Sequence, residues 1–451
     1  MNPSPNYRHI VFFYLLIGFI FVLASAGITT YSLGYRYNFS KHQIVKTGIL
    51  RLSPTNPEYQ INIDGEPISP SIVKNTTEIP NLLPGTYQID ITSDQSLPWS
   101  KKITIQPNRI TNETNILIIP SQIEINDLAI TKNYTSNPSQ NLLAFINIDK
   151  IQILNINTQQ VTTYPDIPLT NDNQLKWLSD QMLSIISRHE NDIQLHTINY
   201  SNSNIASTSL TNIDFDQLLA YYSFQPNIIL YQKNDQIWQL DLTSNNQPIP
   251  IATSTTTPTL IDNTLFYTIA TDLGTTINSI NLTYNYNLEY KFDHIFTQYF
   301  VSRPIKYIFT KPDKNNYRLS FLDSNAGTST QNLTLDIKDI QSYQNYILAK
   351  TDNELTLINT HNFPDISSQT ILRLSKKIHQ SWWLNAQNII YTTDNELYRI
   401  DIDGDNNQLI FSNPSGNIEL VGISGRNITI INNSNNQKLI QNISLPTSSI
   451  N

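Results

Sequence analysis

Residues 389–404 read IIYTTDNELYRIDIDG, and this stretch carries the pattern that decides the fold. An apolar run at 389–391 is followed by a polar turn at 394–395 and by an alternating run at 397–400. Side chains alternate between the two faces of a strand, so these runs predict an antiparallel strand pair. Asp403-Gly404 is a hairpin signal that follows the second strand.

The same unit recurs through the chain after Pro120. Its first strands are centred at residues 145, 185, 230, 266, 308, 348, 390 and 421, and the last copy joins 420–421 to 428–430. The steps of 40, 45, 36, 42, 40, 42 and 31 residues lie near the ~40–45 residues of a propeller blade. Residues 177–183 (WLSDQML) also resemble residues 383–389 (WLNAQNI), 206 positions later.

A sheet that is apolar on both faces buries them when it stacks radially between two neighbours. We therefore predict a mainly β chain whose residues 121–451 form a seven- or eight-bladed β-propeller. The short last step predicts that the final sheet borrows a strand from residues 123–130. The stretch LYRIDIDGDN at 397–406 resembles blades of TolB and WD40-like propellers. A row of separate β-sandwiches is the alternative.

Glycine is scarce, with 12 in the whole chain. Asparagine and aspartate tolerate positive φ better than other residues, so they can replace glycine in tight hairpins. We expect this role at Asn234-Asp235, Asp352-Asn353 and Asp394-Asn395.

The N-terminal region contains one long apolar segment, Ile10 to Ile28, without a charge. At ~1.5 Å per residue it spans a bilayer core of ~30 Å. We predict a cytoplasmic tail at 1–9 and a transmembrane signal anchor at 10–33. A signal peptide cut after residues 24–26 is the alternative. The cations that follow the segment favour a cytoplasmic bulk by the positive-inside rule.

Between the anchor and the repeats we predict a juxtamembrane linker at 34–46 and a small β-sandwich at 47–120. Its turn signals are Asp64-Gly65 and Pro84-Gly85. Together with Ser53-Pro54, Tyr87 and Pro98-Trp99, these residues resemble the PEGA domain family. Gly34-Tyr35-Arg36-Tyr37, just after the apolar segment, is also similar to membrane-anchored PEGA proteins of small-genome bacteria. This resemblance implies an extracytoplasmic envelope protein without catalytic residues. Asn56-Pro57-Glu58-Tyr59 departs from the family pattern.

Composition excludes several kinds of chemistry. The chain has 451 residues, a net charge of −8 and 14% charged residues, without a basic run that would suggest nucleic-acid binding. There is no cysteine, which excludes disulfides and cysteine-ligated zinc.

No catalytic, cofactor or metal motif emerges from the sequence. The histidines stand at 9, 42, 189, 196, 294, 361 and 379, and only His189 and His196 are close enough to suggest a shared metal. The string at 422–425 is too short for a serine-hydrolase elbow and is expected between strands. Residues 323–328 resemble a sialidase Asp box only in part, since they lack its terminal aromatic residue and the motif occurs once. Residues 401–405 are interpreted as a hairpin turn, because their glycine comes too early for a calcium loop.

These observations predict a non-enzymatic, membrane-anchored envelope protein whose propeller binds protein or cell-wall or surface polymer, with no cofactor and no nucleic acid. Tryptophans at 177, 238, 382 and 383 are expected to fill space between blades, with sugar stacking as the alternative. The alternative functions are a carbohydrate-active or other enzyme with its site in the propeller channel, and a cytoplasm-facing sensor or scaffold.

Overall fold

The computed structural model describes residues 5–445 with short gaps. The gaps are 40–41, 56–58, 69–70, 74–75, 95, 132, 165–166, 171–172, 190–191, 212, 214, 222–227, 244–246, 262–263, 272–273, 283–285, 293–295, 297, 302–306, 312–316, 322–329, 334–335, 363–364, 426 and 435–436. The chain separates into two compact units, with the boundary between Gln122 and Ile123.

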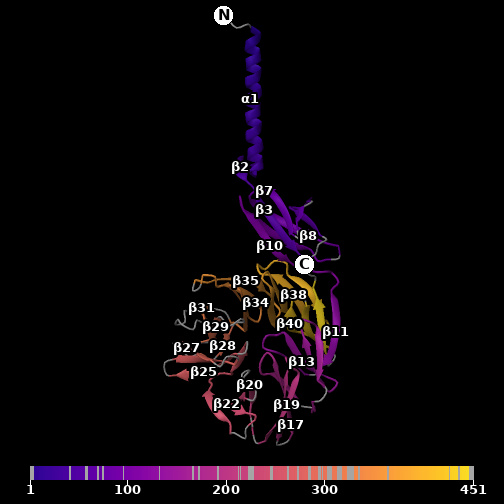
Figure 1. Cartoon of the computed structure of the whole chain (residues 1–451), viewed down its shortest axis with the longest axis vertical. Coiled ribbons are helices and arrows are strands. Elements are labelled where there is room, and N and C mark those ends of the chain that lie inside the picture. Colours follow the sequence, from indigo (N-terminus) through magenta and orange to yellow (C-terminus); the bar gives the residue numbers. More distant parts are fainter. Residues whose placement is uncertain are drawn as a thin grey trace. The chain divides into compact units, whose positions relative to one another are not determined.

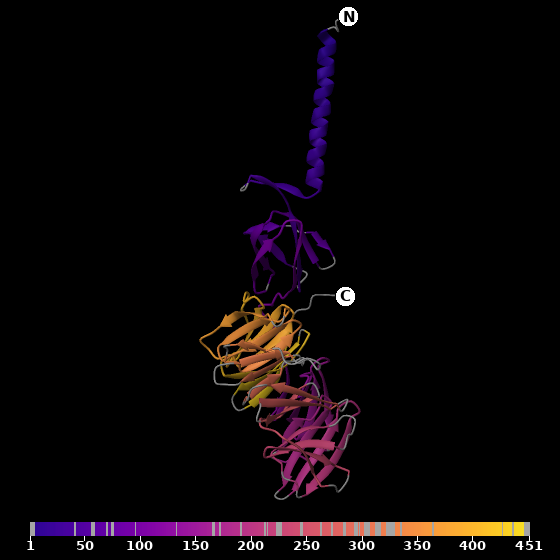
Figure 2. The same cartoon turned by 90° about the vertical axis from the view of Figure 1, so that its left-hand side faces the viewer.

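The first unit begins with the helix α1, Pro5–Ser32, an uninterrupted helix in Figures 1 and 2. Its segment Ile10–Ser32 has a mean hydropathy of 2.5 and is not buried by the rest of the protein. Large apolar side chains such as Phe12, Phe21 and Leu23 are exposed all around it. The helix is therefore long and apolar enough to cross a membrane, and a signal sequence has the same properties.

The residues predicted as a linker form an antiparallel hairpin of β1 (Tyr35–Asn38) and β2 (Gln43–Lys46). Arg36 stacks on the ring of Tyr31, 3.5 Å from its centroid, and donates hydrogen bonds to the carbonyl oxygens of Tyr31 and Tyr35. The Lys46 ammonium lies 5.7 Å from the Tyr35 ring centroid. These contacts connect the end of α1 to the hairpin.

Two four-stranded sheets follow. The first, in the order β10-β3-β7-β6, contains Ile110–Ile116, Gly48–Pro54, Thr76–Leu82 and Ser71–Val73. The second, in the order β5-β4-β8-β9, contains Glu66–Ile68, Gln60–Ile63, Gly85–Thr92 and Trp99–Ile105. Both sheets contribute to one apolar cluster, which includes Leu50 and Leu52 from the first and Ile89, Ile91 and Trp99 from the second.

The predicted turns of this region are present. Asp64 and Gly65 have φ values of 50° and 85° in the β4–β5 hairpin, as a tight turn requires. Pro84-Gly85 leads from β7 in one sheet to β8 in the other. Strand β10 pairs in parallel with β3, a long-range pairing that the sequence pattern did not reveal. Residues 56–58, where the resemblance to PEGA domains is weakest, lie outside the described residues.

The second unit contains eight four-stranded sheets within the described part of Ile123–Leu445. The first three are β12–β15 (Tyr134–Ser136, Leu142–Asn147, Lys150–Asn155, Gln160–Tyr164), β16–β19 (Gln174–Trp177, Met182–His189, Asp192–Asn199, Asn204–Thr211) and β20–β23 (Gln217–Tyr221, Ile228–Lys233, Gln236–Asp241, Ile249–Thr253).

The next four sheets are β24–β27 (Thr259–Ile261, Thr264–Thr271, Gly274–Asn281, Tyr286–Phe292), β28–β31 (Gln298–Val301, Tyr307–Lys311, Tyr317–Phe321, Thr330–Leu333), β32–β35 (Asp339–Tyr343, Tyr346–Lys350, Glu354–Asn359, Ser367–Arg373) and β36–β39 (Gln380–Asn385, Asn388–Thr392, Glu396–Asp401, Gln408–Ser412). Within each sheet, strands that are consecutive in the chain pair antiparallel, and the second and third form the predicted pair.

The eighth sheet joins the two ends of the unit. Its order is β11-β42-β41-β40, with bounds Glu124–Thr131, Gln437–Ser444, Asn427–Ser434 and Gly416–Ser424. Strand β11 pairs with β42, and Figure 1 shows it beside the C-terminal strands. This confirms that the last sheet borrows a strand from residues 123–130.

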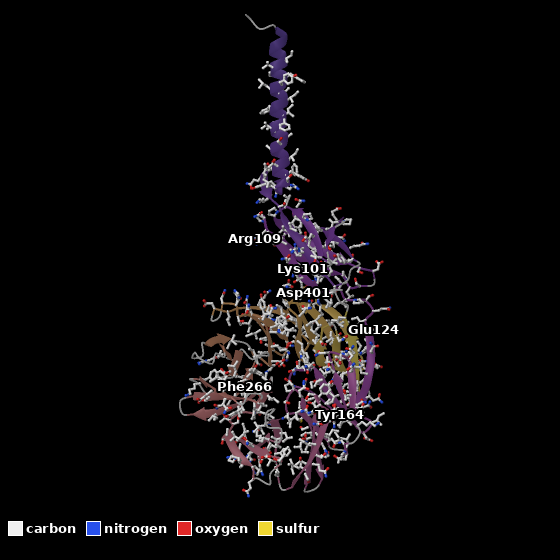
Figure 3. The ribbon with its side chains drawn as sticks, viewed as in Figure 1. Lys101, Arg109, Glu124, Tyr164, Phe266 and Asp401 are labelled. Atoms are coloured by element: carbon white, nitrogen blue, oxygen red, sulfur yellow. The ribbon has the colours of Figure 1, made fainter. Side chains whose placement is uncertain are left out.

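The sheets form a closed ring. The first strands of neighbouring sheets contact one another, as in β12 with β16, β20 with β24 and β36 with β40, which makes them the innermost strands. Apolar clusters fill the space between sheets, and one of them joins Phe145 and Ile156 of the first sheet to Val421 and Ile431 of the last. The unit is therefore a β-propeller, and the alternative of separate sandwiches is excluded. Figure 3 labels Tyr164 and Phe266, two of its buried aromatics.

Three local predictions are corrected. The run at 420–421 belongs to β40, the first strand of its sheet, whereas the other seven runs are second strands. The second strand is β41, and its Ile430 lies 40 positions after Ile390, so the short last step disappears. The string at 422–425, expected between strands, ends β40 and turns into β41.

The third correction concerns the turns. Asn234 has a φ of 54° in its two-residue hairpin, as predicted. Asp352-Asn353 and Asp394-Asn395 do not have positive φ. Their hairpins are four residues long, and the Thr351 hydroxyl accepts hydrogen bonds from the N–H groups of Asn353 and Glu354. The longer loop closes without a left-handed residue.

Candidate ligand-binding cavity at the innermost strands

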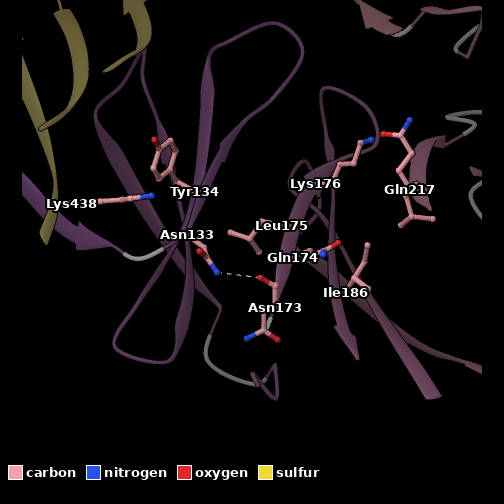
Figure 4. A pocket seen from close by; sticks show the side chains of 10 residues that line it. Asn133, Tyr134, Asn173, Gln174, Leu175, Lys176, Ile186, Gln217 and Lys438 are labelled. Atoms are coloured by element: carbon pink, nitrogen blue, oxygen red, sulfur yellow. Dashed lines mark hydrogen bonds between the residues drawn. The ribbon is translucent and has the colours of Figure 1, made fainter. Parts of the chain in front are cut away.

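A cavity of about 540 Å³ lies where three innermost strands begin. Strands β12, β16 and β20 supply most of its wall, together with one residue each from β17 and β42. The lining residues are Asn133, Tyr134, Asn173, Gln174, Leu175, Lys176, Ile186, Gln217, Leu218 and Lys438 (Figure 4). We call this space the Lys176 cavity.

A second cavity of about 360 Å³ lies further along the same strands and also includes Lys176. Its wall is formed by Thr135, Ser136, Asn137, Pro138, Gln140, Lys176, Trp177, Leu219, Pro258, Thr259, Leu260 and Leu265. The Trp177 indole N–H donates a 3.0 Å hydrogen bond to the Thr135 carbonyl oxygen and links β16 to β12. Lys176 is thus shared by two cavities at the innermost strands.

Lys176 has no counter-ion among the residues that the structure describes. Its backbone is fixed in β16, where it pairs with Ser184, whose hydroxyl donates a 2.7 Å hydrogen bond to the Lys176 carbonyl oxygen. Its ammonium group makes no hydrogen bond or ion pair with the residues that the structure describes, and burial alone lowers the pKa of Lys176 below 10.5. Figure 4 shows the side chain extending toward the Gln217 side of the cavity.

The amide side chains of the wall are held in place by hydrogen bonds. Asn133 Nδ2 donates to the Asn173 carbonyl oxygen at 3.1 Å, which joins the starts of β12 and β16 (Figure 4). Asn173 Oδ1 accepts from the Ser187 hydroxyl at 2.8 Å. Gln217 Nε2 donates to Gln232 Oε1 at 2.8 Å, so the Gln217 oxygen is not used in that bond. The polar part of the wall is therefore preorganised.

The far wall contains Tyr134 and Lys438. The Tyr134 hydroxyl donates a hydrogen bond to Glu419 Oε2, and burial together with this carboxylate raises the tyrosine pKa well above its usual range. The Lys438 ammonium lies 4.9 Å from the centroid of the Tyr134 ring, a cation–π distance. Lys438 is thus already engaged at this wall.

The described linings of both cavities combine polar, apolar and cationic groups. Their described linings contain amides, hydroxyls, aliphatic and aromatic groups and two lysines, but no aspartate, glutamate or histidine. Histidine and carboxylates are the usual general acids and bases, and lysine and tyrosine can also serve. Leu175, Ile186 and Leu218 add apolar surface to the Lys176 cavity.

The residues that the sequence singled out do not converge on a site. His196 is buried on β18, where its Nδ1 contacts the Ser207 hydroxyl at 2.7 Å, and burial lowers its pKa. It pairs with Ile185, whereas His189 pairs with Asp192. Four register positions separate the two histidines, or ~13 Å, which is too far for a shared metal.

The other histidines are also separate. His379 contacts the Asp394 carboxylate on an exposed loop, and His361 and His42 are exposed. No group of three or more histidine, aspartate or glutamate side chains could hold a metal ion among the described residues. His294 and the Asp-box resemblance at 323–328 lie outside them.

The Asp401–Asp405 stretch is occupied by structural contacts. Asp401 pairs with the fully buried guanidinium of Arg399, and Asn406 Nδ2 donates to its second oxygen at 2.8 Å. Gly404 has a φ of 94° and lies against the Ile371 backbone, where a Cβ would be 2.7 Å from the carbonyl oxygen. These contacts favour the hairpin reading over a calcium loop.

Sequence reasoning missed Lys176. The string Gln174-Leu175-Lys176-Trp177 shows one cation in an otherwise ordinary strand. Its importance follows from the position of β16 on the inside of the ring, which depends on long-range stacking. The similarity between residues 177–183 and 383–389 begins at Trp177, the neighbour of Lys176. It could therefore have pointed to this innermost strand.

Comparison with known proteins identifies no family. No family model matches the chain, and no curated protein matches it. Among solved structures, Hsv2 of Kluyveromyces lactis superimposes with a TM-score of 0.42 at 15% identity, covering 62% of this chain and 97% of Hsv2. Sqt1 of Saccharomyces cerevisiae gives a TM-score of 0.44 at 9% identity, covering 72% and 98%. Because these TM-scores are below 0.5, the fold assignment rests on the sheet order and ring contacts described above.

Proposed function

We propose that this chain is a non-enzymatic, membrane-anchored protein whose propeller binds a protein or a cell-wall or surface polymer outside the cytoplasm. The observation that carries the proposal is the lining of the two cavities. In the described residues the wall offers hydrogen-bonding amides and apolar surface, without a carboxylate or imidazole, the groups that most often serve as general acids and bases.

We further propose a tail at 1–9, a membrane anchor at 10–33 and a juxtamembrane segment at 34–46. A PEGA-like sandwich at 47–120 and a propeller at 121–451 follow. The two sheets that share one core support the sandwich. The eight four-stranded sheets support eight blades rather than seven. The exposed apolar surface of α1 supports a helix that spans the membrane.

The cations that follow the helix bear on the orientation of the anchor in the membrane. Arg36 and Lys46, which follow the helix, would favour a cytoplasmic bulk by the positive-inside rule. Both have structural partners: Arg36 donates to Asn81 Oδ1 at 2.9 Å, and Lys46 donates to Asn108 Oδ1 at 3.0 Å. These contacts give the two cations a role in the folded domain that is independent of orientation.

A protease added to intact cells tests this topology. If the bulk is extracytoplasmic, the protease should degrade the propeller while a cytoplasmic control protein stays intact. Protection until the membrane is permeabilised would contradict it and would favour the cytoplasm-facing sensor or scaffold.

Binding to isolated cell wall tests the polymer version. The full-length chain in detergent should sediment with wall material, and an unrelated detergent-solubilised membrane protein should not. If the chain stays in the supernatant, the wall-polymer version is wrong and a protein partner becomes the proposal to test.

A further inference from the structure

The Lys176 ammonium is the most conspicuous unused charge in the described part of the propeller. Lys176 lines a cavity and is half-buried, burial lowers its pKa, and its ammonium has no partner among the described residues. Removing a charged group from water without a counter-charge is costly. Natural interiors normally compensate such a group, so an uncompensated cation in a cavity suggests that the counter-charge comes from a ligand.

We propose that the Lys176 cavity binds a carboxylate-bearing small molecule with an apolar body. The carboxylate pairs with Lys176 Nζ, and the body lies against Leu175, Ile186 and Leu218. This inference concerns a small-molecule site within the ring. It does not depend on the anchor, the orientation or the macromolecular partner proposed above.

The size and composition of the cavity fit such a ligand. Small-molecule sites typically measure 300–1,000 Å³ and combine apolar walls with a few placed polar groups. The Lys176 cavity has about 540 Å³, three aliphatic side chains and a set of hydrogen-bonded amides. The amide of Gln174 makes no hydrogen bond with a described residue and can serve a second ligand oxygen.

The charge balance favours a carboxylate over a phosphate. One ammonium neutralises one negative charge, whereas a phosphate group at neutral pH carries up to two. The described part of the cavity lining contains no arginine to supply a bidentate clamp. Lys438, the second cation of the described lining, lies at the other wall, where its ammonium contacts the Tyr134 ring (Figure 4).

The test uses the full-length chain in detergent micelles and two matched probe pairs. Phenylacetate and indole-3-acetate are compared with their neutral amides, and inorganic phosphate is a third probe. Acetylation of lysines by an activated acetate ester, followed by peptide mass spectrometry, reports which lysines each probe protects. Calorimetric titration measures the affinities.

The proposal expects at least one of the two acids, but neither amide, to protect Lys176. The exposed Lys150 on β14 should react equally with and without probe. Lys176→Gln should weaken binding of that acid roughly tenfold or more, because a hydrogen bond to a charged group is worth about 1.5–3 kcal/mol. Lys150→Gln should bind as the unmodified chain does.

Three results would overturn the proposal. Equal protection by acid and amide would make the site an apolar one, and protection by phosphate but by neither acid would make it a phosphate site. Failure of both acids to protect Lys176 would show that it is no carboxylate site. If Lys176→Gln does not fold, the protection experiment on the unmodified chain still decides.

Discussion

Arg399 shows how a single residue can hold a blade together. Its guanidinium has no exposure, pairs with Asp401 and donates a 2.6 Å hydrogen bond from Nε to Asn388 Oδ1. Asp401 has only 7% exposure, so each charge of the pair depends on the other. This pair fixes the turn that leads from β38 to β39.

The first prediction tests this dependence. Arg399→Met should lower the free energy of unfolding by about 3–5 kcal/mol, because it leaves the Asp401 carboxylate buried without its partner. The double variant Arg399→Met/Asp401→Asn removes both charges and should lose less stability than Arg399→Met alone. Urea unfolding of the three chains measures the difference. A double variant less stable than the single one would contradict the argument.

His196 provides a prediction on pH. Burial lowers its folded pKa below 6.5, so between these two values the unfolded chain binds a proton that the folded chain does not. Stability should therefore fall as the pH decreases below about 6.5. His196→Gln should remove this contribution, and the difference in melting temperature between the two chains should change between pH 7.5 and pH 5. A constant difference would show that His196 is not linked to folding.

At the scale of elements, the innermost strands are joined by side chains that reach from one sheet to the next. Trp177 Nε1 donates to the Thr135 carbonyl oxygen at 3.0 Å, and Trp383 Nε1 donates to the Gln341 carbonyl oxygen at 3.5 Å. In both cases donor and acceptor are 42 residues apart. These two tryptophans, which were expected to fill space between blades, thus also form hydrogen bonds between neighbouring sheets.

The two tryptophans form a matched pair for a prediction. Trp177→Phe should cost about 1 kcal/mol or more, because it removes the indole donor and some apolar contact. Trp383→Phe should cost less, since its bond is longer and the phenylalanine can keep the stacking on Tyr343. Thermal unfolding of both variants checks the order. A larger loss for Trp383→Phe would show that the hydrogen bond is not the deciding contact.

The strand pairs were predictable from sequence, whereas the first strands were not. The second and third strands are local: Ile389 pairs with Ile400 across one short loop, and the alternation of apolar residues marks both. First strands such as β16 are short and mixed in polarity, so Lys176 gave no signal. The misassigned run at 420–421 was an apolar first strand, which the same rule took for a second one. The hydrophobic pattern of a strand indicates that its side chains are buried, but it does not indicate which neighbouring strand or sheet covers them.

At the scale of the whole molecule, the ring depends on the contact between its last and first sheets. Gly422 on β40 lies against Ile156, and a Cβ at position 422 would be 2.1 Å from Ile156 Cδ1. The remaining near atoms of Ile156 would be 3.2 Å away. Any larger residue at position 422 would therefore force the end of the Ile156 side chain to move, because the two sheets approach closely here.

Gly422→Ala should destabilise the propeller by about 1–3 kcal/mol through overpacking. Ile156→Val removes the Cδ1 atom and should restore part of the stability in the double variant, although alone it should cost about 0.5–1.5 kcal/mol. Chemical unfolding of the four chains forms a double-mutant cycle. Additive effects would show that the two residues do not meet at the junction.

The pairing of β11 with β42 has a consequence for how the protein is made. Asp127 and Gln441, which are hydrogen bonded across the last sheet, are 314 residues apart in the chain. At about 5–20 residues per second, synthesis of that interval takes roughly 15–60 s. During this time the nascent β11 has no hydrogen-bonding partner on its native edge and is open to pairing with other chains. We expect assembly to be post-translational and to benefit from a chaperone that covers this early segment until the last residues emerge.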